Sequence, residues 1–262
     1  MWKWSALMPH PPVLIPEVGR GRENEAAKTL SGISELTREL KDKMPDVLLV
    51  LSPHQPYAPG ALYVNSAEII SGSFRMYGAG NVKIEAETSN EFHNFCDFLN
   101  AENVNFYALP TKNLTQDQGS MVPLYFLHKA WGTLPPVLIC SPIGLTPEEA
   151  FKLGQSLRKF ESKKSFALLA SGDLSHRLTP DAPAGYEPEH APVFEAAVEE
   201  ALRTCSTSPI MKLSSQTLER AGECGLRSVM TMLGLAGENA AIKIFSHEWP
   251  FGVGYCNALW KN

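Results

Sequence analysis

The chain has 262 residues, of which 44% are hydrophobic and 19% are charged, which is ample for a large folded core and excludes a disordered chain. Its formal net charge of −5 excludes the strongly basic surface that nucleic acids and anionic membranes attract, so we expect neither as a partner. Five scattered cysteines exclude a disulfide framework and fit a reducing compartment. The sequence also shows no signal peptide and no apolar run of ~20 residues, so we expect a cytoplasmic protein.

The first half of the chain predicts strands and helices in alternation. A strand over 4–8 precedes a helix over 24–43, in which apolar residues recur at spacings of three and four. The next strand, 47–51, is apolar at every position, as in a parallel sheet that is buried on both faces. This order predicts a βαβ unit with parallel pairing. The elements expected next are a strand over 61–64, a mobile glycine-rich flap over 71–80, a helix after Ser89 and a strand over 106–109.

The second half continues the alternation. Asp117 is expected to cap a helix to about 131, and Thr146-Pro-Glu-Glu149 is a capping box that predicts a helix to about 160. With no internal repeat and no linker, we predict one α/β domain over 1–262, with a central, mostly parallel sheet flanked by helices. The other expected elements are strands over 136–140, 166–170, 241–245 and 254–259, and helices over 194–203 and 218–235, the last broken near 222–225.

Three histidines follow predicted strands. Pro9-His10 and Pro53-His54 come directly after the first two strands, and His176 comes shortly after the strand over 166–170. Proline cannot donate to a sheet ladder, so each Pro-His pair marks the carboxyl end of its strand. A lone histidine is more often a hydrogen-bonded structural side chain. Ligands gather at this edge of an open α/β sheet, however, so three histidines there predict a shared site.

Two imidazoles and one carboxylate are the ligand set of non-haem Fe(II) sites that activate oxygen. Glu223 is attractive as the carboxylate because it lies at a helix break, where a side chain can point inward. A helix-terminal glutamate that faces water is nevertheless the commoner case. The four acidic candidates are Glu17, Asp117, Asp173 and Glu223.

Six segments, in this order, resemble the class III extradiol ring-cleavage dioxygenases, in the branch of the LigB-type catalytic subunit and the Memo-like proteins. The resemblance spans almost the whole chain. It implies an α/β fold with His10, His54 and Glu223 as metal ligands and His176 as the acid–base residue. The segments are Leu7-Met-Pro-His10-Pro-Pro, Leu51-Ser-Pro-His54, Asp117-Gln-Gly-Ser-Met-Val-Pro-Leu, Ser171-Gly-Asp-Leu-Ser-His176-Arg-Leu, Glu223-Cys-Gly-Leu-Arg and Pro250-Phe-Gly-Val-Gly-Tyr255.

The chain departs from this family pattern at two positions. Gln118 stands where the dioxygenases commonly carry a histidine over the substrate, and glutamine cannot move a proton at neutral pH. Cys224 adjoins Glu223, and a His-His-Cys set suits zinc or copper better than iron. We favour Glu223 as the third ligand, and we expect Asp117 to support the site by capping a helix or orienting a ligand.

The resemblance implies a dioxygenase that holds Fe(II) and inserts O₂ into a catechol-type aromatic diol, with His176 moving the protons. Zinc or another divalent metal is the alternative cofactor. Two other functions stay open: a non-catalytic Memo-like protein that binds a metal or a peptide, and a zinc hydrolase that uses the same pocket. Some relatives have a second subunit over the pocket, so a homo-oligomer or a small second subunit also stays open as a partner.

Overall fold

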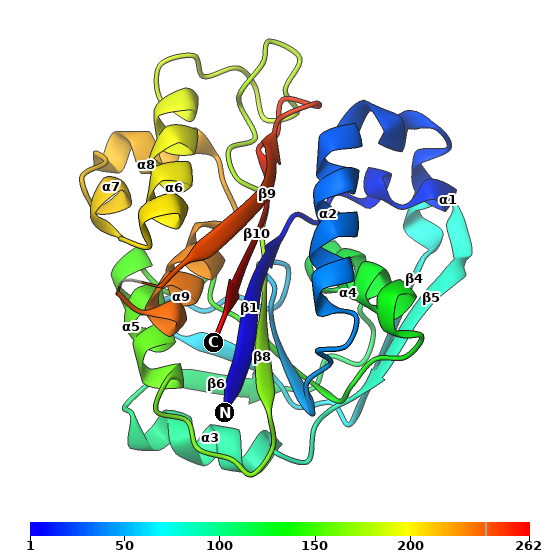
Figure 1. Ribbon diagram of the computed structural model, residues 1–262, viewed down its shortest axis with the longest axis vertical. Helices are drawn as coiled ribbons and strands as arrows, with labels where there is room; N and C mark the ends of the chain where they lie inside the picture. Colours follow the sequence, from blue (N-terminus) through cyan, green and yellow to red (C-terminus); the bar gives the residue numbers. More distant parts are fainter. Residues whose placement is uncertain (239) are drawn as a thin grey trace.

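The computed structural model describes residues 1–238 and 240–262, and an eight-stranded sheet lies at its centre (Figure 1). Its strand order is β6-β3-β7-β2-β8-β1-β10-β9. The pairs β6/β3, β7/β2, β2/β8 and β8/β1 are parallel and the other three neighbouring pairs are antiparallel, so the predicted mostly parallel sheet is confirmed. The strands are β1 (Trp2–Met8), β2 (Val47–Leu51), β3 (Leu62–Asn65), β6 (Phe106–Leu109), β7 (Val137–Ser141), β8 (Phe166–Ser171), β9 (Ile242–Glu248) and β10 (Tyr255–Lys261).

The predicted βαβ unit differs in one respect from the structure. β1 and β2 run parallel, but β8 lies between them, and Leu7 and Leu51 each pair with Ala170 of β8. All three strands are apolar and buried, so the sequence pattern of each strand carries no mark of its neighbours. Because β8 lies between β1 and β2, the carboxyl ends of these three parallel strands lie side by side.

Helices cover both faces of the sheet (Figure 1). Successive residues of β2 point to opposite sides: Leu48 and Val50 join one apolar cluster with α2 and α4, while Val47 and Leu49 join another with α5, α6 and α9. The sheet is therefore buried between two helical layers, as its all-apolar strands predict. The α-helices are α1 (Pro16–Gly19), α2 (Ala27–Leu40), α3 (Phe92–Ala101), α4 (Gln118–Trp131), α5 (Pro147–Leu157), α6 (Ala191–Thr204), α7 (Ser208–Met211), α8 (Ser215–Ala221) and α9 (Leu226–Ala236).

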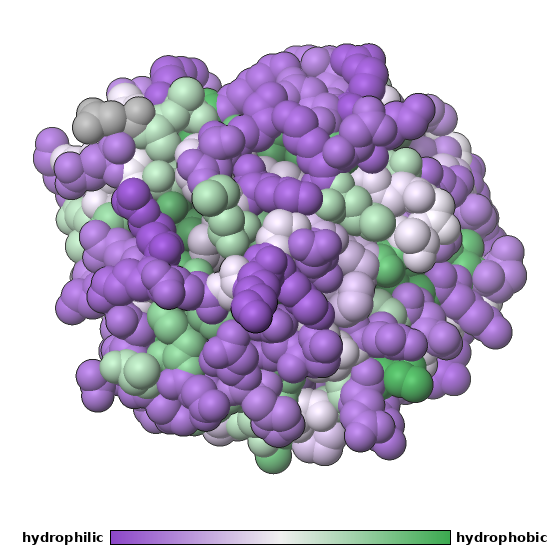
Figure 2. All heavy atoms as spheres, turned by 60° about the horizontal axis from the view of Figure 1, so that its bottom comes forward, coloured by the Kyte–Doolittle hydropathy of each residue, from purple (hydrophilic) through white to green (hydrophobic). Residues whose placement is uncertain are grey.

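The outer surface differs sharply from these two cores. Figure 2, which brings the bottom of Figure 1 forward, shows a mostly hydrophilic face with small, separate hydrophobic patches. Among the described residues, no helix is long and apolar enough to cross a membrane.

The predicted glycine-rich flap is a β-hairpin. β4 (Ile69–Phe74) pairs antiparallel with β5 (Ala79–Glu87), and the short 3-10 helix η3 (Arg75–Tyr77) connects them. Gly78, with φ at +77°, makes the turn after η3. Buried residues of both strands belong to the apolar cluster of α2 and α4, so the hairpin extends that side of the core and carries Tyr77 at its tip.

Two helices begin at the capping signals that the sequence shows. Asp117 caps α4 by accepting from the Ser120 amide, and Thr146 begins α5 in a capping box with Glu149, as predicted. The break expected near 222–225 separates α8 from α9. The remaining short 3-10 helices are η1 (Pro12–Leu14) and η2 (Arg22–Ala26).

Replacing Glu39 by Gln is expected to lower the free energy of unfolding at pH 7 by less than about 1 kcal/mol, because partly exposed ion pairs contribute little. Glu39 on α2 bonds Lys243 of β9 and Lys261 of β10, at 2.5 and 2.6 Å, and these bonds lower its pKa to about 2. A lowered carboxyl pKa stabilises the fold above the unfolded value of 4.5, and the contribution is lost as the pH falls from there to about 2. Urea unfolding of both proteins across this range should therefore converge at its acid end; a constant difference would contradict the ion-pair explanation.

Candidate metal centre

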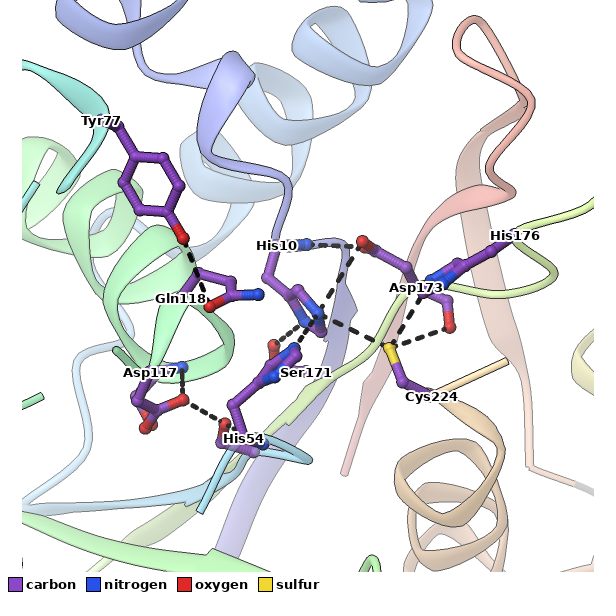
Figure 3. A network of polar contacts seen from close by, with 11 residues as sticks. His10, His54, Tyr77, Asp117, Gln118, Ser171, Asp173, His176 and Cys224 are labelled. Atoms are coloured by element: carbon purple, nitrogen blue, oxygen red, sulfur yellow. Dashed lines mark hydrogen bonds and ion pairs between the residues drawn. The ribbon is translucent and has the colours of Figure 1, made fainter. Parts of the chain in front are cut away.

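Candidate functional side chains gather where β2, β8 and β1 end (Figure 3). Leu51 and Leu7 both pair with Ala170, so three residues further along the strands the same register places positions 54, 173 and 10 in one row. A hydrogen bond between two members of this row supports it, because the His10 amide donates to Asp173 Oδ1 at 2.9 Å. Parallel strands of one register thus deliver both predicted histidines to one place.

The two imidazoles of His10 and His54 meet edge to face. Their Nε2 atoms lie 3.0 Å apart, and the ring planes are inclined by 81°. His10 is buried and its Nδ1 contacts Ser171 Oγ at 2.9 Å, whereas His54 is exposed. Burial, followed by the proximity of His54, holds the pKa of His10 well below its ordinary value, so this ring is neutral at neutral pH. The tautomer that donates Nδ1–H to Ser171 leaves the Nε2 lone pair facing His54.

Cys224 supplies the third ligand atom of this cluster. Its Sγ lies 3.6 Å from His10 Nε2, and the three ligand atoms of His10, His54 and Cys224 all lie within 4.8 Å of one another. The loop between α8 and α9 reaches this place because Gly172 and Gly225 pack backbone to backbone, where a Cβ on Gly172 would overlap the other residue. Burial raises the pKa of the Cys224 thiol well above its usual range, with further contributions from nearby carboxylates, so binding of a metal here would release the thiol proton.

Glu223, which the sequence favoured as the third ligand, uses both carboxylate oxygens in hydrogen bonds at the start of α9. Its Oε2 accepts from the Leu226 amide at 2.6 Å, and its Oε1 accepts from Arg227 at 2.5 Å. The side chain therefore caps the first turn of α9 and neutralises a nearby guanidinium. The geometry favours Cys224 over Glu223 as the third ligand, because the carboxylate oxygens already have partners at the helix end.

Two of the three separations between ligand atoms fit a bound transition metal. Metal–nitrogen and metal–sulfur bonds of zinc in tetrahedral geometry separate two nitrogens by about 3.3 Å and a nitrogen from a sulfur by about 3.6 Å. The observed separations of 3.0 Å between the imidazoles of His10 and His54, and 3.6 Å between His10 and the Cys224 sulfur, are close to these values. An open coordination position remains for substrate when only three protein ligands bind.

Asp173 and His176 lie beside the cluster on the loop after β8. His176 Nε2 is 3.9 Å from Cys224 Sγ, and Asp173 Oδ2 is 3.7 Å from His10 Nε2. Burial lowers the pKa of His176, although Asp173 opposes the shift, so the ring is neutral at neutral pH and can accept a proton. Burial raises the pKa of Asp173 to about 6, against the opposing bond from the His10 amide. The loop thus holds a neutral imidazole next to the cluster.

Asp117 supports the turn that presents His54. The buried carboxylate accepts from Ser52 Oγ at 2.5 Å, from the Ser120 amide at 3.0 Å and from the Gln55 side chain. Ser52 Oγ accepts in turn from the His54 amide at 3.2 Å. Asp117 therefore ties the start of α4 to the end of β2.

Replacing Asp117 by Ala is expected to lower the free energy of unfolding by about 2–4 kcal/mol, because it removes a helix cap and leaves buried donors of Ser52 and Gln55 without an acceptor. Asp117→Asn, which keeps one acceptor oxygen, should cost less. Urea unfolding followed by circular dichroism measures both variants. Equal stability of the wild type and the Ala variant would show that water replaces the carboxylate.

Gln118, at the start of α4, lies next to the cluster of His10, His54 and Cys224. Its Oε1 is 3.5 Å from the hydroxyl of Tyr77, which the β4–β5 hairpin brings over the site (Figure 3). With Oε1 on the Tyr77 side, the amide Nε2 is the atom left to donate toward His10. Gln118 therefore offers a hydrogen-bond donor on the His10 side of its amide.

The structure also shows where sequence reasoning was incomplete. Ser171, Ser52 and Tyr77 contact the candidate site residues, but only the two serines lie in the motifs. The segment that carries Tyr77 was predicted as a mobile flap and not as part of the site. Glu17, one of the four acidic candidates, is exposed on α1, where it contacts the Tyr125 hydroxyl at 3.3 Å.

The chain is similar to a protein family, to a curated protein and to solved structures. The model of the catalytic LigB subunit of aromatic ring-opening dioxygenase matches residues 5–257. The protein CA_C1420 of Clostridium acetobutylicum is 32% identical over 260 residues, which cover 95% of this chain and 55% of that protein, so the chain spans about half of this curated relative. The crystal structure of the uncharacterized protein JW3007 from Escherichia coli K12 covers 98% of this chain and 99% of its own, with a TM-score of 0.64 and 13% identity, and supports the α/β fold.

Proposed function

Because the chain belongs to the family of catalytic LigB subunits of aromatic ring-opening dioxygenases, we propose that it binds one divalent metal ion through His10, His54 and Cys224 and opens the ring of an aromatic diol with O₂. Fe(II) is the proposed cofactor for this reaction. Cys224 replaces Glu223, which the sequence favoured, as the proposed third ligand.

One observation carries the metal site: three ligand atoms from three separate chain segments lie within 4.8 Å of one another. The segments follow β1, β2 and α8, which lie far apart in the sequence. The fold therefore brings the three atoms together, and no local sequence motif does so. His10 is neutral, as a metal-binding imidazole needs to be, and its ring is buried with Nδ1 in contact with Ser171 Oγ.

A bound Fe(II) ion would supply a site for the two diol oxygens and a route for electrons from the ring to O₂. His176 accepts a proton from a diol hydroxyl and returns one to the ring-opened product, as its neutral imidazole permits. Gln118 donates its amide hydrogen to a substrate oxygen and holds the diol in one orientation. Both atoms of O₂ end in the product, so no other reductant is consumed.

The thiol of Cys224 favours a second candidate, a zinc hydrolase with His176 as its base. A His-His-Cys set with an open position suits zinc or copper better than Fe(II), since thiolate is a soft ligand. A non-catalytic Memo-like protein that binds a metal or a peptide at this place would share the same ligand set. Metal analysis of protein purified without oxygen separates iron from zinc, and a zinc-only result favours the hydrolase.

Replacing His176 by Gln is expected to lower kcat for ring opening by about 10²–10⁴-fold, because glutamine cannot carry the proton. Oxygen uptake and the absorbance of the ring-opened product, measured with a panel of catechols and Fe(II)-loaded protein, give the rate. The His176→Gln variant should keep its metal, since His176 is not a proposed ligand.

Two results would contradict the dioxygenase. One is oxygen uptake that His10→Ala leaves unchanged, which would place the activity outside this site. The other is turnover in His176→Gln equal to that of the wild type, which would leave the ring opening without its proposed base.

A further inference from the structure

A buried carboxylate–imidazole pair lies behind the loop that carries His176. Glu195 of α6 is 3% exposed, and its Oε2 contacts His247 Nε2 of β9 at 2.6 Å. The other ring nitrogen of His247 contacts Glu199 at 2.9 Å, one helical turn further along α6 and closer to solvent. Burial pulls the pKa of His247 down, but its bonds to both glutamates outweigh burial and raise it, which favours a charged ring between them.

The second oxygen of Glu195 holds the loop. Its Oε1 accepts from the Ser175 amide at 2.7 Å, and Ser175 immediately precedes His176. Gly254 leaves the room for this carboxylate, because a Cβ there would overlap it, and the Gly254 amide donates to the Ser175 carbonyl at 2.8 Å. The backbone next to His176 is therefore bonded on both sides.

The same serine also connects His176 to the loop of the candidate thiol. Ser175 Oγ donates to the Ala221 carbonyl at 2.7 Å, three residues before Cys224, and accepts from the Arg177 amide at 3.2 Å. Its own side chain is fully buried. One bond from Glu195 thus acts on the segment that sets the spacing between the His176 ring and Cys224.

We propose that Glu195, held by His247, is a positioning residue that fixes the His176 imidazole beside Cys224. This inference rests on the proposed role of His176 and adds a residue that the sequence motifs do not contain.

The location of the pair argues for more than joining α6 to β9. Burying a carboxylate carries a desolvation cost unless bonds repay it, whereas apolar side chains of similar volume would join the two elements at no such cost. Glu195 directs one oxygen away from its ion-pair partner and onto the backbone beside the proposed base. Glu199 provides the contrast, because it bonds His247 and Arg203 but makes no contact with Ser175.

The test compares Glu195→Ala with Glu199→Ala as a matched control, both in the full chain. Both variants lose one carboxylate from His247, and only the first loses the acceptor of the Ser175 amide. In protein labelled with ¹⁵N-histidine, at a single pH, Glu195→Ala should move the ring signals of His176, which His176→Gln assigns, and Glu199→Ala should leave them in place. With an active diol, Glu195→Ala should lower kcat about 10-fold or more, with KM changed less than about 3-fold.

Unmoved His176 signals in Glu195→Ala, with a lower melting temperature in both variants, would overturn the proposal and leave a structural ion pair. Should Glu195→Ala fail to fold, Glu195→Asp serves, because it keeps the charge but draws the carboxylate back from Ser175; it is expected to move the same signals. The signals require no turnover, so they decide the positioning role even if the chain proves inactive on every diol.

Discussion

Replacing His10 by Ala is expected to abolish stoichiometric metal binding. The wild-type chain should hold about one divalent metal ion, and the variant should bind it about 10²-fold or more weakly, because a buried imidazole leaves the ligand set. His10 is the central member of the cluster, since its Nε2 lies within 3.6 Å of both His54 and Cys224. Elemental analysis after gel filtration, together with competition against a chromophoric chelator, measures content and affinity.

His128→Ala is the control for His10→Ala, because His128 is an exposed histidine on α4, outside the cluster. It should bind metal as the wild type does. His54→Ala should lose the metal as His10→Ala does, although His54 is exposed and its removal should cost less stability. Metal content that stays at the wild-type level in both His10→Ala and His54→Ala would remove the metal centre and the dioxygenase proposal together.

Much of this candidate site could be predicted because the sequence pattern shows where buried strands end. The all-apolar run of β2 followed by Ser-Pro-His54 marks a buried parallel strand, its end and the edge at which its next side chain arrives. The same reasoning places His10 and His176. What it cannot give is the order of strands: β8 separates β1 from β2, and only the shared partner Ala170 shows that positions 10, 173 and 54 form one row.

The choice between Glu223 and Cys224 depends on a local competition. A carboxylate three residues before a helical amide, and four before an arginine, has two partners within its own helix start. Leu226 and Arg227 stand at these positions, so the sequence does contain the signal that Glu223 is a cap. The break predicted near 222–225 gives this helix start only approximately, and the structure shows that α9 begins at Leu226, next to Gly225, which packs on Gly172. Once Glu223 turns to the helix, its neighbour on the loop faces the imidazoles.

Replacing Cys224 by Ala is therefore expected to weaken zinc binding by about 10²-fold or more, whereas Glu223→Gln should leave it near the wild-type level. The first change removes a ligand atom 3.6 Å from His10 Nε2, and the second keeps the oxygen that accepts from the Leu226 amide. Titration of the metal-free protein with zinc against a chelator gives both affinities. The reverse result, with metal lost in Glu223→Gln and kept in Cys224→Ala, would restore the glutamate as the ligand.

Cys224→Asp extends this comparison to the choice of metal. It exchanges the soft thiolate for a hard carboxylate beside His10 and His54, and so builds the ligand set of the non-haem Fe(II) oxygenases. We expect the ratio of Fe(II) to zinc bound under anaerobic competition to rise by about 10-fold or more relative to the wild type, because thiolate favours zinc. If the dioxygenase proposal holds, ring opening should survive this exchange. A variant that binds Fe(II) and opens no diol accepted by the wild type would show that the thiol itself takes part in the reaction.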